Sequence, residues 1–187
     1  MDSKELMSYG PLGALIGKWQ GDKGDDIAPG DDLGKENNKY REEILFVPCG
    51  ATFNHEQKLM GVHYSLHAWR LTETTPFHEE SGYLLWDERE KLIIRSTIIP
   101  RGFAMLAGGK AEPDAKKFTV SAKLGSSIFG ICSNPYLDKE FKTLAFDHTL
   151  TLLAPDQISY EQDTQIQISG QKEIFHHTDK NVLKKIG

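Results

Sequence analysis

Apolar and polar residues alternate at every second position through most of this 187-residue sequence. The alternation begins after Trp19 and continues to about Ile168, and it is typical of strands that bury one face. Short turn signals separate the runs, and no segment between them is long enough for a crossover helix. Because closure of consecutive antiparallel strands removes exposed sheet edges, the pattern favours an up-and-down barrel. We predict an all-β fold, a closed antiparallel β-barrel of eight to ten strands that forms one domain over residues 1–187.

Turn residues set the expected strand boundaries. One strand is predicted from about Lys39 to Val47. The next run, Thr52–Thr72, is either a hairpin that turns at Met60–Gly61 or one long strand bent at Gly61. Three further hairpins are expected, with turns at Glu88–Glu90, Pro113–Asp114 and Ala154–Asp156.

One short helix and two loops complete the expected fold. Pro11 fits the first position of a helix that Gly17 ends, and no other helix is expected near the N-terminus. Residues 22–38 are rich in Gly, Pro and Asp, so we expect a loop between the first two strands that lies over one barrel mouth. Residues 124–135 form a second expected loop, whose apolar residues should pack against the barrel.

The composition excludes several classes of partner. The sequence holds 22 Lys and Arg against 27 Asp and Glu, a net charge of −5, which gives no basic footprint for a nucleic acid. No apolar run approaches the roughly 20 residues of a membrane span, and no secretory signal is recognisable. We expect a soluble cytoplasmic protein without a membrane or nucleic-acid partner, in which Cys49 and Cys132 are reduced and buried. The sequence leaves the oligomeric state open, and a homodimer is one option.

The usual hydrolase and nucleotide-binding motifs are missing. No P-loop, GxGxxG, HExxH or nucleophile elbow occurs. Two pairs of adjacent carboxylates do occur, Glu42–Glu43 and Glu79–Glu80. Neighbours on a strand point to opposite faces, so neither pair can act on one substrate as an acid and a base.

Four of the seven histidines are expected to have no role in binding. His63 and His67 lie four residues apart on a strand, which separates them by roughly 13 Å. Zinc–nitrogen bonds of about 2 Å cannot bridge that distance, so we expect surface or rim histidines. His55 and His148 each share a strand face with apolar residues, which predicts buried, neutral, hydrogen-bonded side chains.

His78 is a candidate cavity residue. It shares a strand face with Glu80 and Gly82, and the glycine either leaves room for a ligand or marks a bend of the barrel. His176 and His177 form a second candidate group after the last long strand. Thr178 could cap a short terminal helical turn that packs its apolar side onto the barrel end. A histidine just before that turn would face the barrel mouth, where it could bind the iron of a cofactor, or it would be an exposed tail residue.

A barrel of this size also has room for an apolar ligand, which makes a non-enzymatic carrier of a fatty acid the alternative function. A carboxylate ligand would need an inward Arg or Tyr, and the strands offer Arg41, Arg70, Arg95, Tyr64 and Tyr83. Arg95 is the best candidate because it lies between Ile94 and Ser96 on an otherwise apolar strand. An outward-facing arginine is the more common arrangement.

Four segments, taken in order, resemble the nitrobindin family, haem-binding β-barrels that also occur as the C-terminal domain of certain THAP proteins. They are "PLGALIGKWQGDKG", "YREEILFVPCG", "FHEESGYL" and "ISYEQDTQI". The resemblance covers nearly the whole chain, and it implies a ten-stranded barrel similar to fatty-acid-binding proteins.

The resemblance also implies a cofactor. Family members hold ferric haem b at the barrel mouth through a C-terminal histidine, bind nitric oxide, and in some cases isomerise peroxynitrite to nitrate. Carried over to this sequence, His177 is the proximal iron ligand, His176 is the reserve candidate, and His78 is the cavity-facing histidine. The second ring nitrogen of the ligand should meet an acceptor such as Asp179 or a backbone carbonyl.

Overall fold

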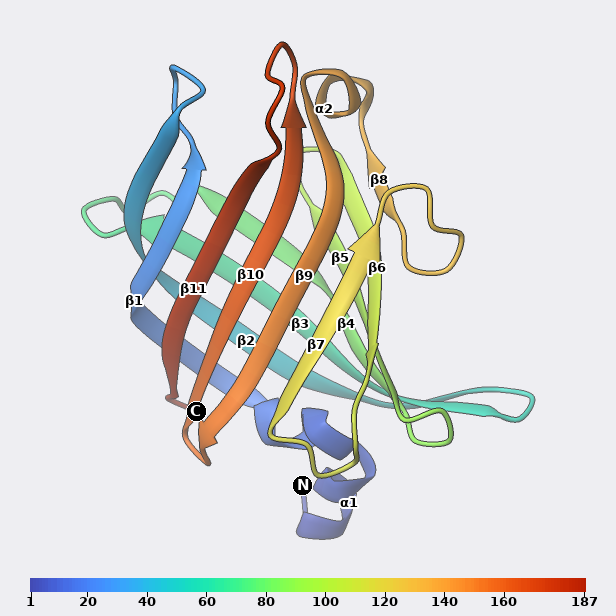
Figure 1. Cartoon of the computed structure of the whole chain (residues 1–187). Coiled ribbons are helices and arrows are strands. Elements are labelled where there is room, and N and C mark those ends of the chain that lie inside the picture. The colour runs from blue at the N-terminus through green and yellow to red at the C-terminus, as the bar shows by residue number, and fades with distance from the viewer.

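Antiparallel strands close into a barrel in the computed structural model, which describes residues 1–187 (Figure 1). The sheet has eleven strands, of which the three-residue β8 pairs only with β6, and the other ten form the barrel wall. The predicted all-β barrel of about ten strands is therefore confirmed. The strands are β1 (Gly17–Pro29), β2 (Lys35–Asn54), β3 (Gln57–Arg70), β4 (His78–Asp87), β5 (Leu92–Ile99), β6 (Phe103–Lys110), β7 (Lys117–Lys123), β8 (Ile131–Ser133), β9 (Phe141–Ala154), β10 (Gln157–Ile168) and β11 (Phe175–Lys185).

Neighbours in the wall follow chain order, as in an up-and-down barrel. The short β8 lies outside this order, so β7 pairs directly with β9. The first and last strands close the wall, with Trp19 opposite Lys185 and Ile27 opposite Thr178. β7 shows the alternation most simply, because Phe118, Val120 and Ala122 are buried and the residues between them are exposed.

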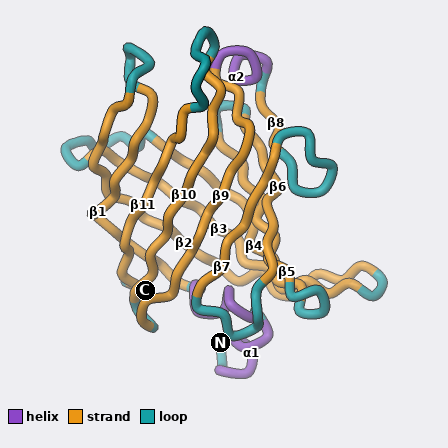
Figure 2. The backbone as a smooth tube through the Cα atoms, in the orientation of Figure 1, coloured by secondary structure: helices purple, strands orange, loops and turns teal.

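The N-terminal segment closes one end of the barrel (Figure 2). It contains a 3-10 helix, η1 (Gly10–Leu15), at the predicted position, and the fully buried Leu12 and Leu15 lie in one core cluster with Trp19. The Trp19 indole donates a hydrogen bond of 2.6 Å to the carbonyl of Leu15. A second helix, α1 (Ser3–Ser8), was not expected, since it buries none of its residues and so has no apolar periodicity.

The predicted loop over residues 22–38 is wrong. Those residues form most of β1 and the start of β2, and only a short turn near Gly30–Gly34 separates the strands. The predicted strand Lys39–Val47 accordingly extends in both directions to Lys35–Asn54. Polar residues occupy both faces of this hairpin, so the apolar alternation is absent there.

The β2–β3 hairpin turns at His55–Glu56, and β3 continues through Met60 and Gly61, so neither predicted arrangement is correct. His55 has φ of 50° at the tip of this turn and is exposed, which corrects its expected burial. The three hairpin turns predicted further along the chain are confirmed.

The predicted terminal helical turn is also wrong. Residues 175–185 form β11, which pairs with both β1 and β10 and thereby closes the barrel. Sheet pairing on both sides satisfies the backbone of Thr178, which the sequence had suggested as a helix cap. Both cysteines are exposed and free, contrary to their expected burial.

Residues 124–135 contain β8 and lead into α2 (Pro135–Glu140) at the end of the barrel opposite the N-terminal helix (Figure 1). The Phe129 ring covers Gly108 so closely that a side chain at Gly108 would collide with it. The expected packing of this loop is therefore confirmed for Phe129, whereas Ile128 is exposed. None of the helices has the length and apolar composition that a membrane-spanning helix needs.

Candidate functional site

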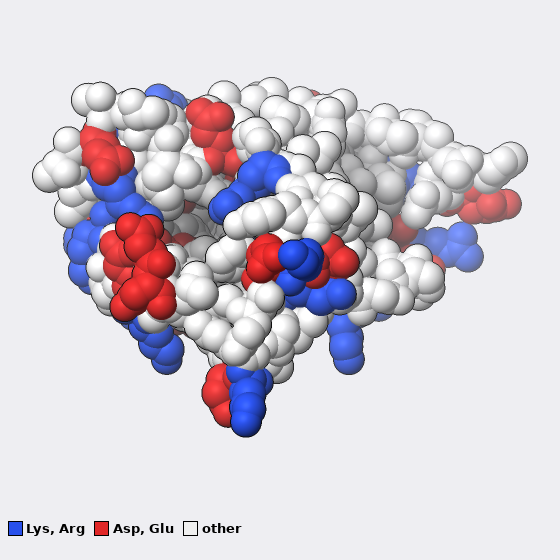
Figure 3. Space-filling view, turned by 90° about the horizontal axis from the view of Figure 1, so that it is seen from above, with Lys and Arg blue, Asp and Glu red and all other residues white.

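A cavity of about 440 Å³ occupies the barrel interior. Of its 36 lining residues 21 are hydrophobic, so the cavity is mainly apolar with polar groups at defined places. Residues of α2 and the first residues of β9 line the cavity, so its opening lies at the end of the barrel away from the N-terminal helix. Figure 3 looks onto this end, where the surface is hollowed and carries both acidic and basic side chains.

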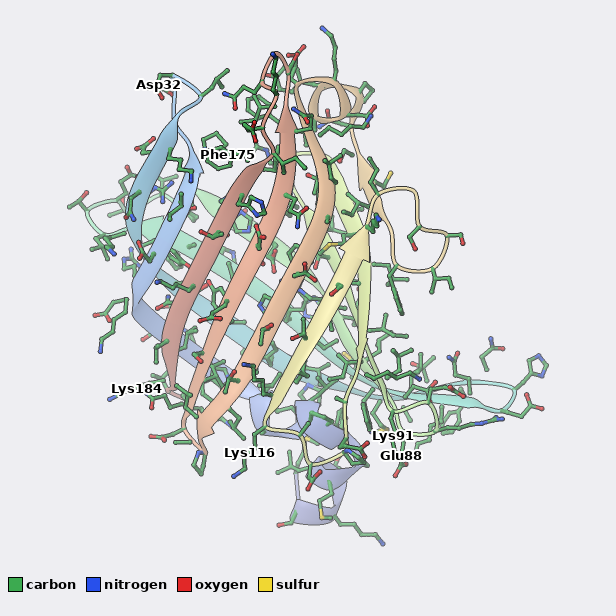
Figure 4. All side chains as sticks on the ribbon, viewed as in Figure 1. Asp32, Glu88, Lys91, Lys116, Phe175 and Lys184 are labelled. Atoms are coloured by element: carbon green, nitrogen blue, oxygen red, sulfur yellow. The ribbon has the colours of Figure 1, made fainter.

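His177 lies near the open end of the cavity. β11 begins at Phe175, which Figure 4 labels at the same end as Asp32 and opposite to Lys184. His177 follows two residues later and lines the cavity. Its Nε2 lies 2.9 Å from Oδ1 of Asp26 and 3.6 Å from Oδ2 of Asp179. The Nδ1 atom makes no hydrogen bond to the protein.

Asp26 holds together a group that we call the mouth cluster, formed by Asp26, Arg70, His177 and Asp179. Asp26 is 1% exposed, and its second carboxylate oxygen accepts a 2.9 Å hydrogen bond from Nη1 of Arg70. Burial alone raises the pKa of Asp26, but the hydrogen bonds from His177 and Arg70 more than offset it, so the net pKa is lowered. Asp26 is therefore a buried anion held by hydrogen bonds to His177 and Arg70.

The other members of the mouth cluster respond to the same charges. Burial and the neighbouring Asp26 raise the pKa of Asp179 to about 6, against the opposing effect of His177. Burial alone lowers the pKa of His177. The hydrogen bond to Asp26 and the charges of Asp179 and Asp26 outweigh this effect, so the net pKa is raised. The ligand atoms of Asp26, His177 and Asp179 lie within 4.8 Å of one another, so these residues could also hold a metal ion.

His176 points the other way from β11. It is exposed, and its Nδ1 lies 2.8 Å from Oδ2 of Asp163. Of the two adjacent histidines only His177 lines the cavity. Asp179, the expected acceptor, lies farther from the ring than Asp26. Asp26 was not expected at the site because it lay in a predicted loop.

His78 lines the cavity from β4 and belongs to a second polar group. Its Nε2 lies 3.6 Å from Oε2 of Glu80, whose Oε1 accepts a hydrogen bond of 2.5 Å from Nη2 of Arg95. Burial raises the pKa of Glu80, but Arg95 and His78 lower it more, and the result is a pKa of about 2. Arg95 lines the cavity and is only 6% exposed, so its side chain faces inward. An outward orientation is the more common one for arginine on a strand.

Tyr64 and Thr97 complete this second group. Their hydroxyl oxygens lie 2.7 Å apart, and Nε of Arg95 lies 3.3 Å and 3.2 Å from them, respectively. Gly82 pairs with both residues in the sheet, and a Cβ at this position would collide with the backbone of β5. Gly82 thus permits a close strand approach and does not leave space for a ligand.

Glu42 is the centre of a third buried group. Its two oxygens accept hydrogen bonds of 2.7 Å from Asn181 and 3.1 Å from Tyr160, whose hydroxyl lies 2.6 Å from that of Tyr40. Burial raises the pKa of Glu42 to about 8, although Asn181 and Tyr160 oppose the shift. Glu43 lies on the outer face with Lys18 at 2.8 Å, so the predicted opposite orientation of these two carboxylates is confirmed.

His148 is buried as predicted, and its ring stacks between two aromatic rings. The Phe146 and Tyr160 ring centroids lie 6.3 Å and 5.3 Å away, at interplanar angles of 7° and 20°. Burial, together with the charge of Arg95, lowers the pKa of His148 well below its usual value, so the ring is neutral. It makes no hydrogen bond to another residue, which corrects the expected partner.

The remaining histidines of β3 lie outside the cavity. His67 is half-buried and lies 3.8 Å from Glu79, and His63 meets Tyr83 edge to face on the outer surface. The expectation of surface histidines is confirmed for this pair.

Comparisons with known proteins identify the family. A family model described as "THAP4-like, heme-binding beta-barrel domain" matches residues 8–185. A structure of Rv2717c from M. tuberculosis aligns over 99% of both chains at 19% identity, with a TM-score of 0.67. An S-type phycobiliprotein lyase, CPES from Guillardia theta, aligns over 100% of this chain and 94% of its own at 9% identity, with a TM-score of 0.57. No curated protein matches the sequence. The family match spans almost the whole chain, and the chain therefore belongs to the THAP4-like, heme-binding beta-barrel domain family.

Proposed function

We propose that this protein holds haem b in the cavity through His177 and acts on nitric oxide or peroxynitrite. The observation that carries the proposal is the placement of His177. β11 presents its imidazole inside the cavity of a chain that belongs to a haem-binding barrel family.

The donor atoms at the mouth suit an iron porphyrin. A carboxylate on one ring nitrogen of a histidine fixes the tautomer and makes the other nitrogen a better metal ligand. Asp26 occupies Nε2 of His177, which leaves Nδ1 without a protein partner. Arg70 and Arg101 line the same cavity, and their positive charges suit the carboxylate groups of haem b.

Apolar residues near the opening would enclose the flat faces of the cofactor. They are Ala28, Pro29, Leu66, Ala68, Phe77, Ile99, Phe103, Leu137, Phe141 and Ile166. Bound haem would supply the iron chemistry of nitric oxide binding or of peroxynitrite conversion to nitrate. The apolar wall excludes water from that chemistry, and Arg101 attracts an anionic substrate toward the opening. His78, which lines the cavity from another wall, is the residue that we expect to contact the bound group from that side.

Titration of the purified chain with hemin tests the proposal. A Soret band should appear at one equivalent and should be lost or strongly weakened in His177→Ala. The matched control is His176→Ala, which removes the neighbouring exposed imidazole and should leave the band unchanged. Nitric oxide should shift the band of the wild type. An unaltered Soret band in His177→Ala would show that another residue holds the iron.

We also propose a cytoplasmic location. Both cysteines are exposed and free, which is compatible with a compartment that keeps thiols reduced. Fractionation of cells that produce the chain, followed by thiol labelling, checks this. Recovery of the chain outside the cytoplasm would contradict it.

A further inference from the structure

The inner part of the cavity contains polar groups with unused hydrogen-bonding atoms. Arg95 uses Nε and Nη2 in hydrogen bonds to Tyr64, Thr97 and Glu80, whereas Nη1 has no protein partner. His148 is 9% exposed, and its ring interacts with its own backbone but has no hydrogen bond to another residue. Buried polar groups are usually paired, because an unpaired donor lowers stability. The free atoms of Arg95 and His148 are not sealed inside the protein but open onto the cavity, where a ligand could pair with them.

Arg95 and His148 reach the same part of the cavity from different strands. The guanidinium carbon of Arg95, on β5, lies 5.6 Å from the ring centroid of Phe146 on β9. The Phe146 ring is nearly parallel to that of His148. The charge of Arg95 also contributes to the lowered pKa of His148. A small group between the two side chains could contact both.

The charges around Arg95 leave it able to attract an anion. Glu80 is ionised, and its two oxygens lie 2.5 Å from Arg95 and 3.6 Å from His78, so Arg95 is not its only partner. Burial lowers the pKa of His78, but the Glu80 carboxylate, 3.6 Å away, raises it more, so the net pKa is raised. Glu42 has a pKa of about 8 and is therefore mainly neutral at pH 7. The inner part of the cavity is thus not dominated by negative charge.

The wall beyond these groups is apolar. The lining residues toward the closed end are Ile44, Phe46, Leu84, Met105, Phe118, Val120, Leu150 and Ile158. Such a wall binds hydrocarbon, whereas a free inorganic anion would leave it without a contact. The ligand chemistry that matches all of these observations is an apolar body with one oxyanion group.

We propose that the inner part of the cavity is a second ligand site, which binds the carboxylate of an apolar organic acid between Arg95 and His148. Nη1 of Arg95 donates to one carboxylate oxygen, and the N–H of the His148 imidazole donates to the other. The apolar body lies against the wall toward the closed end. This site differs from the mouth, where His177 lies, and it does not depend on haem.

A displacement experiment on the full chain, purified without haem, tests the proposal. The probe is 11-(dansylamino)undecanoic acid, whose fluorescence rises in an apolar pocket. Dodecanoic acid should displace it at micromolar concentration, and methyl dodecanoate should be at least tenfold weaker. Sodium nitrate should not displace it at millimolar concentration. Equal affinity for the acid and the ester, or displacement by nitrate but not by the acid, would overturn the proposal.

Two variants locate the site. His148→Phe removes the N–H and keeps an aromatic ring in the stack, and the double variant Glu80→Gln/Arg95→Gln removes both charges so that neither is left buried alone. Each should bind dodecanoic acid at least tenfold more weakly and the ester unchanged. The matched control is His63→Phe, the same exchange on the outer face, which should behave as the wild type. An acid preference retained in both variants would refute the assignment.

Hemin titrations separate the two proposed sites. His177→Ala should lose the Soret band and keep its preference for the acid over the ester. His148→Phe should keep the Soret band and lose the preference for the acid. Loss of both kinds of binding in His148→Phe, at unchanged thermal stability, would mean that the inner groups hold haem. That result would overturn the second site.

Discussion

Asp26 is the residue on which the geometry of the mouth cluster depends. It is almost fully buried, and it holds the His177 imidazole on one oxygen and Arg70 on the other. Carboxylates that orient a metal-binding histidine typically contribute 10- to 100-fold to metal affinity. We therefore expect Asp26→Asn to weaken hemin binding by roughly 10- to 100-fold, as measured from the Soret titration.

Asp179→Asn is the comparison variant, because Asp179 lies 3.6 Å from the same nitrogen and is a weaker partner. Its effect on hemin affinity should be smaller than that of Asp26→Asn. Tighter hemin binding by Asp26→Asn would contradict the proposed orienting role. It would show that Asp26 competes with iron for Nε2.

Glu42 makes the stability of the barrel depend on pH. Its pKa is about 8 in the folded chain, compared with an ordinary value of 4.5. Between these two values the folded chain keeps a proton that the unfolded chain releases, so the contribution of Glu42 is lost as the pH rises toward and through 8. Since one pKa unit corresponds to about 1.4 kcal/mol, the full effect is on the order of a few kcal/mol.

Glu42→Gln should remove this dependence, because an amide still accepts from Asn181 and cannot ionise. In urea unfolding at pH 5, 7 and 9, the variant should lose less free energy of unfolding with rising pH than the wild type. Glu43→Gln is the control, since Glu43 is on the outer face and Lys18 holds its pKa below the usual value. Parallel pH profiles for Glu42→Gln and the wild type would refute the assignment.

Among the elements, the strands that could be predicted from the sequence are those with an apolar inner face. β7 has Phe118, Val120 and Ala122 inside, and alternation identified it at once. The inward positions of β1 and β11 near the mouth are instead polar, with Asp26 on β1 and His177 on β11. Polar residues on both faces of a strand erase the periodicity. The polar residues that form the site therefore removed the alternating pattern by which β1 and β11 could have been predicted from the sequence.

The candidate site was predictable only in part for the same reason. The family resemblance singled out His177 and His78, and both line the cavity. Asp26 lies 151 residues from His177 in the sequence, and only the closing pair β1–β11 brings them together. Arg95 could not be oriented from its position between Ile94 and Ser96, because its inward side chain depends on Glu80 from the neighbouring strand.

At the scale of the whole molecule, the outer surface carries an uncharged band across β2 to β6. Two rows of residues run across β2 to β6 in register, and neither contains Asp, Glu, Lys or Arg. The rows are Val47, His63, Tyr83, Ser96 and Leu106, and Leu45, Ser65, Ser81, Ile98 and Ala104. Ile98 is 62% exposed and Tyr83 is 46% exposed. Five residues of this band, Leu45, Val47, Tyr83, Ile98 and Leu106, are exposed large apolar side chains, and exposed apolar surface of this kind marks interaction sites.

An uncharged face best matches a second uncharged face, and another copy of the chain supplies one. We therefore expect a homodimer with two-fold symmetry through β2 to β6, since such an interface is complementary to itself. Ile98→Glu places a charge at its most exposed apolar position and should give a monomer in sedimentation velocity at micromolar concentration. Leu153→Glu, at a position 52% exposed on β9, is the matched control and should stay dimeric. A monomeric wild type would contradict this assembly, and equal dissociation of both variants would place the interface elsewhere.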